Sequence, residues 1–339
     1  MDMANVAKIN LVTLKQNAKT IKKRLNNGVK FCAVVKADAY GHGGVECASA
    51  LYGIVDCFAV AILEEAIALR LSGIDKDILI LTPLQKNEIL RAIEYNLTLS
   101  ISSLKELKDI DEICLKANKK AKVHIAYNTG MNRLGLDGIK TLKKAIEFIK
   151  GSNGIILDGF YSHFAYPENK KALTEAVNNF LLAKKLIKSY NSKVTCHISA
   201  SGGFLAGVQE DMVRIGILLY GYKPFDSDFN VKPIMKIFSH VVKSRTLHKG
   251  ESALYGFNPA DSQKRISIIR YGYADGLSRK AISGQFNNRC MDLTAISQNK
   301  KEHKVCVMDN ADVLAKEYNT ISYEILVSAS SRAEKIYIR

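Results

Sequence analysis

Residues 97–127, LTLSISSLKELKDIDEICLKANKKAKVHIAY, carry the pattern from which the fold can be predicted. A short run rich in apolar and β-branched residues (97–102) is followed by a longer stretch with apolar residues at three- and four-residue spacing (103–117). A second short apolar run then covers 122–127. Short apolar runs are typical of buried strands, whereas the longer period is typical of a helix that packs one face against a core. The stretch therefore predicts a strand–helix–strand unit.

The same unit recurs through the first two-thirds of the sequence. We expect strands at 31–36, 57–61, 78–81, 97–102, 122–127, 154–161, 193–199 and 212–216, whose starts lie 19 to 39 residues apart. This spacing suits βα units that are joined by right-handed crossovers. Eight such units close a (βα)8 barrel of the TIM type, for which about 200 residues suffice. An open doubly wound sheet is the alternative, but it more often has five or six strands.

The pattern changes after about residue 225, where short strands are broken by Gly, Asn and Asp turns. Pro224 and Pro233 lie at the change, and proline disrupts both helices and strand ladders. We therefore expect an α/β chain with a barrel domain over 10–225 and a mainly β C-terminal domain over 226–339. Residues 1–9 are expected to join the second domain.

The composition restricts the class of protein. A hydrophobic share of 47% with 24% charged residues is typical of a globular chain. No window approaches the roughly 20 apolar residues that span a bilayer, and the first residues do not resemble a secretory signal. Seven scattered cysteines without a CxxC pair favour neither a disulfide framework nor a zinc site. We expect a cytoplasmic protein with no metal and no membrane partner.

The net charge raises the question of nucleic-acid binding. Lys and Arg number 49 against 33 Asp and Glu, which gives a formal charge of +16. Nucleic-acid interfaces gather their cations on one face. Here the lysines alternate with apolar residues at helical spacing, so most are expected on solvated helix faces. We therefore do not expect a nucleic-acid partner.

The residues able to do chemistry follow the ends of the predicted strands. The active site of such a barrel lies at the carboxyl ends of its strands. Seven residues fall there: Lys36, Arg133, His163, His197, Ser201, Arg214 and Gly216. Their common position predicts that one site brings them together.

Lys36 and two small-residue segments indicate the cofactor. An unpaired ammonium at the end of a buried strand is costly, although pairing with Asp38 would be a simple explanation. Residues 199–203 (SASGG) and 214–216 (RIG) offer a hydroxyl and backbone N–H groups where barrels commonly bind phosphate. A desolvated lysine can form a Schiff base with a carbonyl. Together these features suggest pyridoxal 5'-phosphate, which has an aldehyde and a phosphate.

Six motifs, taken together, resemble the alanine racemase family in order and spacing, from about residue 5 to about residue 325. They are VVKADAYGHG (34–43), YNTGMNRLGL (127–136), SHFA (162–165), MVRIGILLYG (212–221), LYGF (254–257) and YGYADG (271–276). The first is the most specific. The resemblance implies a pyridoxal-phosphate-dependent isomerase, built from a (βα)8 barrel and a β domain, that works as a homodimer with shared active sites.

The resemblance also implies a role for each matching residue. Lys36 matches the lysine that holds the cofactor and acts as one catalytic base, and Tyr255 matches the opposite base, which reaches the site of the partner subunit. The cofactor-binding matches are Tyr40, Ser201, Gly216 and Ile217 at the phosphate, His163 beside the ring, and Arg214 at the pyridine nitrogen with His197 hydrogen-bonded to it. The substrate-binding matches, which correspond to family residues near the substrate, are Arg133, Tyr273 and Met308.

These roles predict interconversion of L- and D-alanine, which would supply D-alanine for peptidoglycan. Inversion needs proton removal on one face and delivery on the other, hence two bases. Both bases must titrate below their reference values of about 10 to be useful near neutral pH. A broad-specificity racemase that also accepts serine is the closest alternative. A non-catalytic pyridoxal-phosphate carrier is another, but it would have no use for the second domain.

The sequence departs from the family pattern at three places. Ala126 replaces a lysine whose carbamate often braces the arginine that Arg133 matches, and Asn128 replaces an aspartate. We expect an anion such as chloride to fill the gap beside Arg133. Ser331 stands where a tyrosine often lines the substrate entrance. These departures leave the choice between alanine and serine open.

Overall fold

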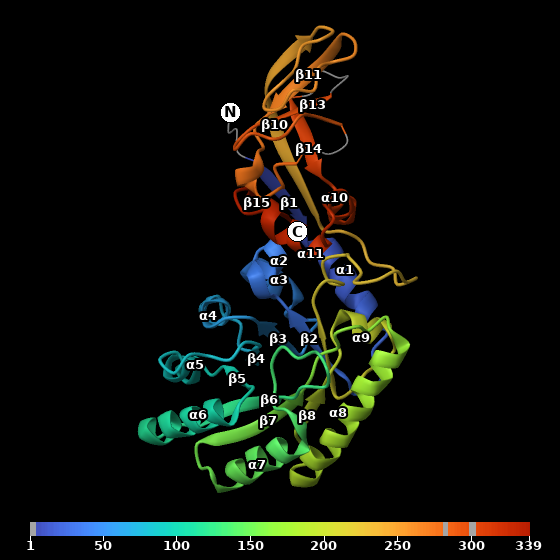
Figure 1. The fold of residues 1–339 in the computed structure, drawn as a ribbon. Coiled ribbons are helices and arrows are strands. Elements are labelled where there is room, and N and C mark those ends of the chain that lie inside the picture. The colour runs from blue at the N-terminus through green and yellow to red at the C-terminus, as the bar shows by residue number, and fades with distance from the viewer. Residues whose placement is uncertain (1–4, 281–283, 298–302) are drawn as a thin grey trace. The chain divides into compact units, whose positions relative to one another are not determined.

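A computed structural model describes residues 5–280, 284–297 and 303–339 of the chain (Figure 1). The chain divides into two compact units. The barrel unit contains residues 15–37 and 44–231, and the β unit contains the described residues of 1–14, 38–43 and 232–339.

Eight parallel strands form the sheet of the barrel unit, in the order β8-β7-β6-β5-β4-β3-β2-β9. They are β2 (Lys30–Val34), β3 (Cys57–Val60), β4 (Ile78–Ile80), β5 (Thr98–Ile101), β6 (Ala121–Ala126), β7 (Ile155–Tyr161), β8 (Thr195–His197) and β9 (Met212–Ile215). The last strand, β9, pairs with the first, β2, and backbone bonds from Asp211 N to Cys196 O and from Arg214 N to Ser199 O link it to β8. The sheet therefore closes on itself.

Helices follow the strands and cover the outside of this sheet (Figure 1). They are α3 (Gly44–Leu51), α4 (Leu63–Leu71), α5 (Ile89–Glu94), α6 (Leu104–Ala117), α7 (Gly138–Gly151), α8 (Lys170–Tyr190) and α9 (Ser201–Leu205), with α1 (Leu11–Lys22) ahead of β2. The sequence quoted first forms β5, α6 and β6, and Ser103 caps α6 by accepting from Glu106 N. Leu107, Ile110 and Cys114 lie buried on one face of that helix.

The β unit is built on a second sheet, with the order β12-β13-β11-β10-β1-β15 and β14 paired with β10. Its strands are β1 (Val6–Asn10), β10 (Met235–Leu247), β11 (Lys264–Ile269), β12 (Gln285–Phe286), β13 (Thr294–Ser297), β14 (Lys304–Met308) and β15 (Glu334–Ile338). Two helices, α10 (Ala311–Tyr318) and α11 (Ser322–Ala329), and the 3-10 turn η1 (Tyr273–Asp275) complete it. The expected fold class, a barrel followed by a mainly β domain, is confirmed.

The compact units depart from the expected domain ranges at both boundaries and at one internal segment. Residues 10–14 belong to the β unit and residues 226–231 to the barrel unit. Residues 38–43 belong to the β unit although they lie in the sequence between two elements of the barrel. They form most of α2 (Lys36–Gly41), which is described below. Sequence periodicity could not show this, because the assignment depends on contacts with residues near the C-terminus.

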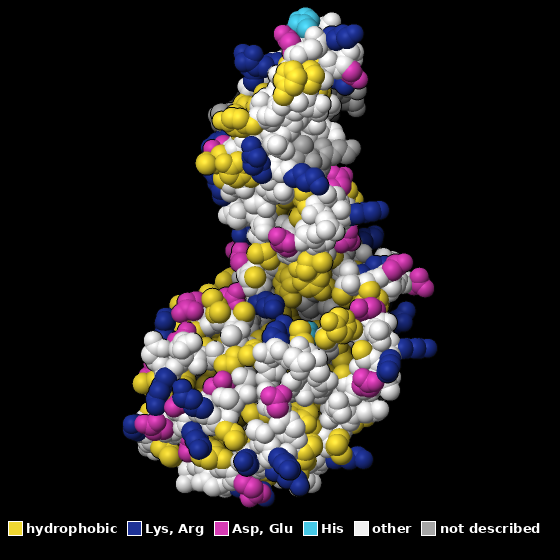
Figure 2. Space-filling model, viewed as in Figure 1, with side chains coloured by type: hydrophobic (Ala, Val, Ile, Leu, Met, Phe, Trp, Pro, Cys, Tyr) yellow, Lys and Arg dark blue, Asp and Glu magenta, His cyan; other side chains and the backbone are white. Residues whose placement is uncertain are grey.

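Surface charge is mixed on the face shown in Figure 2, where Lys and Arg alternate with Asp and Glu over the barrel unit. No helix among the described residues is long and apolar enough to cross a membrane. Within the same residues, no group of three or more His, Cys, Asp or Glu side chains could hold a metal ion.

Candidate active site

Lys36 lies two residues beyond the end of β2, at the carboxyl end of the barrel strands. Its side chain is partly buried. Burial lowers the pKa of the Lys36 ammonium from its ordinary value, the charge of Arg133 lowers it further, and the carboxylate of Glu65 raises it. The amine is therefore more easily present in its neutral, basic form than an exposed lysine would be.

The backbone directly after Lys36 turns in the left-handed sense. Residues 37–40 have φ angles between 51° and 55°, and Gly41 has a φ of 81°. Each non-glycine residue in this region costs about 1–2 kcal/mol, so a run of four stores strain. In the barrel unit, Glu65 of α4 accepts a hydrogen bond from Ala37 N at 2.5 Å and supports the start of the turn.

Within the β unit, the C-terminal segment holds the rest of this turn. Ser330 Oγ donates to Gly41 O at 2.9 Å, and Lys335 Nζ pairs with Asp38 Oδ2 at 2.8 Å. Asp38 therefore has Lys335 as an ion-pair partner. A Cβ on Gly41 would lie 2.4 Å from Ser330 Oγ and 2.5 Å from Leu326 O, so only glycine fits there.

Tyr40 lies on the left-handed turn, and its ring lies 5.8 Å from that of Tyr323. Burial raises the pKa of the Tyr40 phenol well above its ordinary value, and Tyr323 adds to the shift. The phenol therefore keeps its proton at neutral pH and can donate a hydrogen bond to an anion. This is the property that a phosphate ligand needs.

Arg214, at the end of β9, is almost fully buried inside the barrel unit. Its Nη1 donates to His197 Nδ1 at 2.5 Å, and its Nη2 donates to Ser162 O at 2.7 Å and contacts His163 Nδ1 and Ile198 O at 3.3 Å. Burial lowers the pKa of Arg214 to about 10. The guanidinium is therefore still charged at neutral pH, and His197 lies where the sequence predicted.

His163 is surrounded by the cations of the site. Burial, and after it the charges of Arg214, Arg133 and Lys36, together lower the pKa of His163 to about 3. The imidazole is therefore neutral at physiological pH. Its Nδ1 faces the Arg214 donor, so the ring proton belongs on Nε2.

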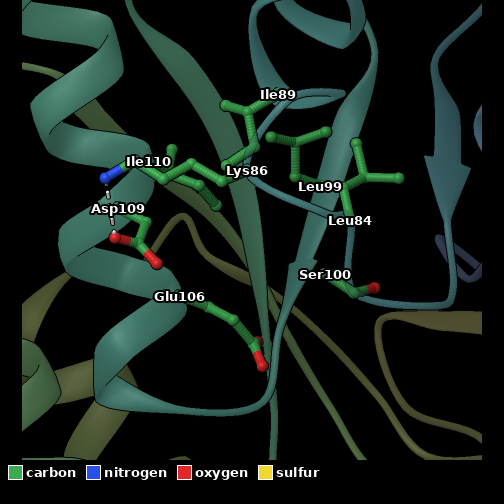
Figure 3. Close-up of a pocket in the computed structure, with 8 residues that line it drawn as sticks. All are labelled: Leu84, Lys86, Ile89, Leu99, Ser100, Glu106, Asp109 and Ile110. Atoms are coloured by element: carbon green, nitrogen blue, oxygen red, sulfur yellow. Dashed lines mark hydrogen bonds and ion pairs between the residues drawn. The ribbon is translucent and has the colours of Figure 1, made fainter.

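Tyr161 and Ser100 support the other side of His197. The Tyr161 ring stacks on the His197 imidazole at 5.1 Å with an interplanar angle of 4°. Its hydroxyl donates to Ser100 Oγ at 3.0 Å, and Ser100 in turn donates to Ile80 O. Ser100 also lines the small hollow of about 20 Å³ in Figure 3, together with Lys86 and Asp109, which form an ion pair. That hollow has room for about one water molecule and is not a substrate site.

Ser201, Gly216 and Ile217 come together at the carboxyl ends of β8 and β9. Gly216 N donates to Ser201 Oγ at 3.2 Å, and Ile217 is buried beside it in the chain. A Cβ on Gly203 would lie 2.6 Å from Ser199 Oγ, so the backbone here packs too closely for a side chain. The segment therefore presents a hydroxyl and backbone groups, as the sequence predicted for a phosphate site.

Arg133 lies exposed on the turn after β6. Asn128 organises that turn: its amide donates to Asn132 Oδ1 and Asp137 Oδ1, and its Oδ1 accepts from Gly130 N and Asn132 N. All four hydrogen-bonding positions of the Asn128 amide are used inside the turn. Asn128 thus shapes the loop that carries Arg133 without contributing a charge.

The barrel part of the site matches the charge of a phosphorylated cofactor. The positive charges of Lys36, Arg133 and Arg214 all lower the pKa of His163. The carboxylate of Glu65 raises the pKa of Lys36. A site with this excess of positive charge attracts an anion. The residues present therefore fit pyridoxal phosphate: an amine of lowered pKa for the aldehyde, and hydroxyl and N–H groups for the phosphate.

The second group of predicted residues lies in the β unit. Tyr255 is 63% exposed on a loop held by Asn287, which donates to Ser252 Oγ and Ala253 O. Leu254 beside it has a φ of 58° and packs against the core of this unit, which anchors the loop. Asn288 N donates to Tyr255 O at 3.3 Å.

Met308 does not lie with these residues. It is 2% exposed in β14, where it pairs with Ile237 of β10. The methionine beside Tyr273 is Met291, which is 55% exposed: Ala274 N donates to Met291 O, and Tyr273 N donates to Cys290 O. The run NNRCMD (287–292) carries that methionine in the sequence, but a Met–Asp pair also occurs at 308–309, and only the structure separates the two.

Comparison with known proteins agrees with the geometry. A family model described as the N-terminal domain of alanine racemase matches residues 9–224, and one described as the C-terminal domain matches residues 234–337. The alanine racemase of Francisella tularensis subsp. tularensis is 33% identical over 365 aligned positions, which cover 97% of this chain and 98% of that protein. The enzyme of Francisella philomiragia is 34% identical with the same coverage.

Solved structures show the same likeness over the whole chain. The alanine racemase of Clostridium difficile 630 superposes with a TM-score of 0.93 at 30% identity, covering 100% of this chain and 96% of that one. The Bacillus anthracis enzyme with bound L-Ala-P has a TM-score of 0.91 at 27% identity, again covering 100% and 96%.

Proposed function

This chain belongs to the alanine racemase family of pyridoxal-phosphate-dependent isomerases, and we propose that it interconverts L- and D-alanine with two bases, Lys36 and Tyr255 of the partner subunit. The observation that carries the proposal is the group of three cations, Lys36, Arg133 and Arg214, around the neutral His163 in the barrel unit. The product D-alanine would serve peptidoglycan synthesis in the cytoplasm.

In this proposal, Lys36 accepts the α-proton of the substrate. The cofactor, when bound, supplies a ring that delocalises the electrons left behind when the α-proton departs. Lys36 can take that proton because its pKa is lowered by burial and by Arg133. Glu65 limits this shift, so the amine keeps enough basicity to hold the proton.

The opposite face needs a proton donor of its own. We assign this role to Tyr255, because its exposed ring at a well-braced loop tip is available to a second copy of the chain. Phe257, 86% exposed, and Met291 extend the apolar surface of the same unit. An exposed apolar surface of this kind favours a protein interface, which supports a homodimer with shared active sites.

Arg214 would bind the pyridine nitrogen as a hydrogen-bond donor. A guanidinium with a pKa of about 10 does not give up its proton readily, so Arg214 would donate a hydrogen bond to this nitrogen without protonating it. His163 lies beside the ring in this proposal, and Ser201 with Tyr40, Gly216 and Ile217 binds the phosphate.

The substrate carboxylate is assigned to Arg133, whose exposed guanidinium lies on the turn after β6. Tyr273 stays in the proposal as a substrate-side residue. Met291 takes the place of Met308 there, because it is the exposed methionine of the same cluster.

The proposal is tested by mixing two inactive variants, Lys36→Ala and Tyr255→Ala. Exchange of subunits should restore part of the racemase activity, since one of the two sites in the mixed dimer has both bases. Absence of any recovery, with subunit exchange verified by mass, would contradict the shared site. The Lys36→Ala protein should also lack the visible absorbance band that borohydride removes from the wild-type holoenzyme. Comparing turnover of alanine and serine separates the proposal from a broad-specificity racemase.

A further inference from the structure

A line of four side chains crosses the interior of the barrel unit from one end to the other. Arg214 Nη1 contacts His197 Nδ1 at 2.5 Å, His197 Nε2 contacts His124 Nδ1 at 2.9 Å, and His124 Nε2 contacts Asp158 Oδ2 at 3.3 Å. Both histidines are buried, whereas the Asp158 side chain is 45% exposed. The line therefore joins the predicted cofactor contact to a carboxylate at solvent.

Arg214, at one end of the line, determines which ring nitrogen of each histidine carries the proton. A guanidinium only donates, so His197 Nδ1 must accept and the His197 proton sits on Nε2. That proton is donated to His124 Nδ1, which places the His124 proton on Nε2, facing Asp158. Burial and the charge of Arg214 lower the pKa of His197 well below its ordinary value, so the ring stays neutral as this order requires.

The fold makes room for this line by two local departures from regular structure. The register between β6 and β7 pairs Val123 with Leu157 and then His124 with Gly159, so Asp158 is the extra residue of a β-bulge. A Cβ on Gly159 would lie 2.4 Å from the His124 ring. The bulge and the glycine together accommodate the imidazole and the carboxylate that accepts from it.

The line begins at a buried cation and ends at a negatively charged side chain. The four contacts of Arg214 described above are two imidazoles and two backbone carbonyls, all neutral. The hydrogen bond from His124 lowers the pKa of the Asp158 carboxyl, with help from Lys122 and Lys30, so Asp158 is ionised at neutral pH.

The hollow around Asp158 lies at the opposite end of the strands from Lys36. It has a volume of about 90 Å³ and is lined by His124, Asp158, Lys30, Asp56, Asp77 and Thr195, among others. Asp77 pairs with Lys122 at 3.1 Å, and Asp56 accepts from Phe31 N. Asp158 is thus the carboxylate of this hollow that contacts His124.

We propose that Asp158 and His124 are positioning residues for the racemase site: from the amino-terminal end of the barrel they accept the hydrogen bond of the His197 Nε2 proton and so hold the His197 ring and, through it, the orientation of the Arg214 guanidinium. Neither residue touches the substrate. The inference rests on the proposed role of Arg214, but the order of the protons is a property of the chain itself and is measurable without cofactor or turnover.

The first test is nitrogen-15 NMR of the histidine side chains in the apoprotein at neutral pH. In the wild type, both His197 and His124 should be neutral with the proton on Nε2. Asp158→Ala removes the acceptor of His124, so the His124 signals should shift toward a mixture of tautomers. The hydrogen bond from His197 Nε2 to His124 should then weaken, which should shift the His197 signals although Arg214 keeps the His197 tautomer. Asp158→Asn keeps an acceptor oxygen and should preserve the tautomers, and it also covers the case that the alanine variant fails to fold.

Asp77→Asn is the matched control, because Asp77 lines the same hollow without contacting His124. It should leave the His197 signals unchanged. Unchanged His197 signals in Asp158→Ala would overturn the proposal. An equal shift of these signals in Asp77→Asn would overturn it too, because the loss of any nearby negative charge would then shift His197, without the line of hydrogen bonds.

The second test uses the holoenzyme. Asp158→Ala should lower kcat by about tenfold while KM for alanine changes by less than about twofold, since a positioning contact acts on the reacting state and not on substrate capture. The kcat of Asp158→Asn should lie between those of Asp158→Ala and the wild type, and the kcat of Asp77→Asn should equal that of the wild type. A rise in KM with unchanged kcat would overturn the proposal. A wild type with the expected tautomers but no racemase activity would instead contradict the proposed function.

Discussion

At the scale of single residues, the left-handed turn after Lys36 is the most demanding local structure of the site. Four consecutive non-glycine residues have positive φ angles, which a free peptide would avoid. The turn persists because Glu65, Ser330 and Lys335 bind its backbone and its Asp38 side chain. This turn carries Tyr40, which is predicted to bind the cofactor phosphate.

Gly41→Ala tests how closely this turn is packed. The new Cβ would collide with Ser330 Oγ and Leu326 O in a backbone region that alanine disfavours. We expect the free energy of unfolding to fall by about 3 kcal/mol. Gly250→Ala is the matched control in the same unit, since Gly250 has a φ of 88° with open space around it, and should cost about 1 kcal/mol. Equal losses in urea unfolding would show that the close approach is not costly.

At the scale of elements, the amino-terminal end of α4 connects helix capping to the chemistry. Glu65 accepts from Ala61 N and Ile62 N at the start of its own helix and from Ala37 N beside Lys36. One carboxylate therefore caps a helix, supports the strained turn and raises the pKa of Lys36. The motif around Lys36 does not reveal this, because Glu65 lies one βα unit further along the chain.

Glu65→Ala should lower the free energy of unfolding by about 1–2 kcal/mol through the lost cap and the lost bond to Ala37. It should also lower the pKa of Lys36 in the apoprotein, since the negative charge that raises it is gone. The measurement is the pH dependence of Lys36 acylation. Glu64→Ala, at the exposed neighbouring position, should change neither quantity. A Lys36 pKa that rises or stays constant in Glu65→Ala would contradict the assignment.

Two other elements show where sequence periodicity stops being informative. The apolar run 154–161 predicts a strand, and β7 is found at Ile155–Tyr161. Its bulge at Asp158 is invisible in the run, because the extra residue is defined only by pairing with β6. Met308 and Met291 both precede aspartate in the sequence, yet one is buried in a strand and the other is exposed beside Tyr273.

At the scale of the whole molecule, buried neutral histidines make the protein sensitive to acid. Burial lowers the folded-state pKa of His163 to about 3 and of His42 to about 4, and that of His197 well below its usual value. The unfolded chain takes up these protons near pH 6.5. Between that pH and the lowered values the unfolded state binds more protons, so stability falls as the pH falls.

Each of these histidines should contribute a slope of about 1.4 kcal/mol per pH unit in this window. We therefore expect the urea midpoint, followed by circular dichroism, to fall steeply between pH 6.5 and about 4. His163→Gln should reduce the slope of the barrel unit by the contribution of one proton. A midpoint that is constant over this range would contradict the assignment of neutral buried histidines.

The sequence by itself determined the alternation of strands and helices, the change to a β domain and the position of Lys36, Arg133, His163, His197 and Arg214 at strand ends. These features follow from local periodicity, and the carboxyl ends of parallel strands meet at one end of a barrel. Only the tertiary structure shows the left-handed turn, the assignment of residues 38–43 to the β unit, the exposure of Met291 with the burial of Met308, and the line from Arg214 to Asp158. Each depends on contacts between residues distant in the chain, whose energies outweigh local preference and leave no periodic trace in the sequence.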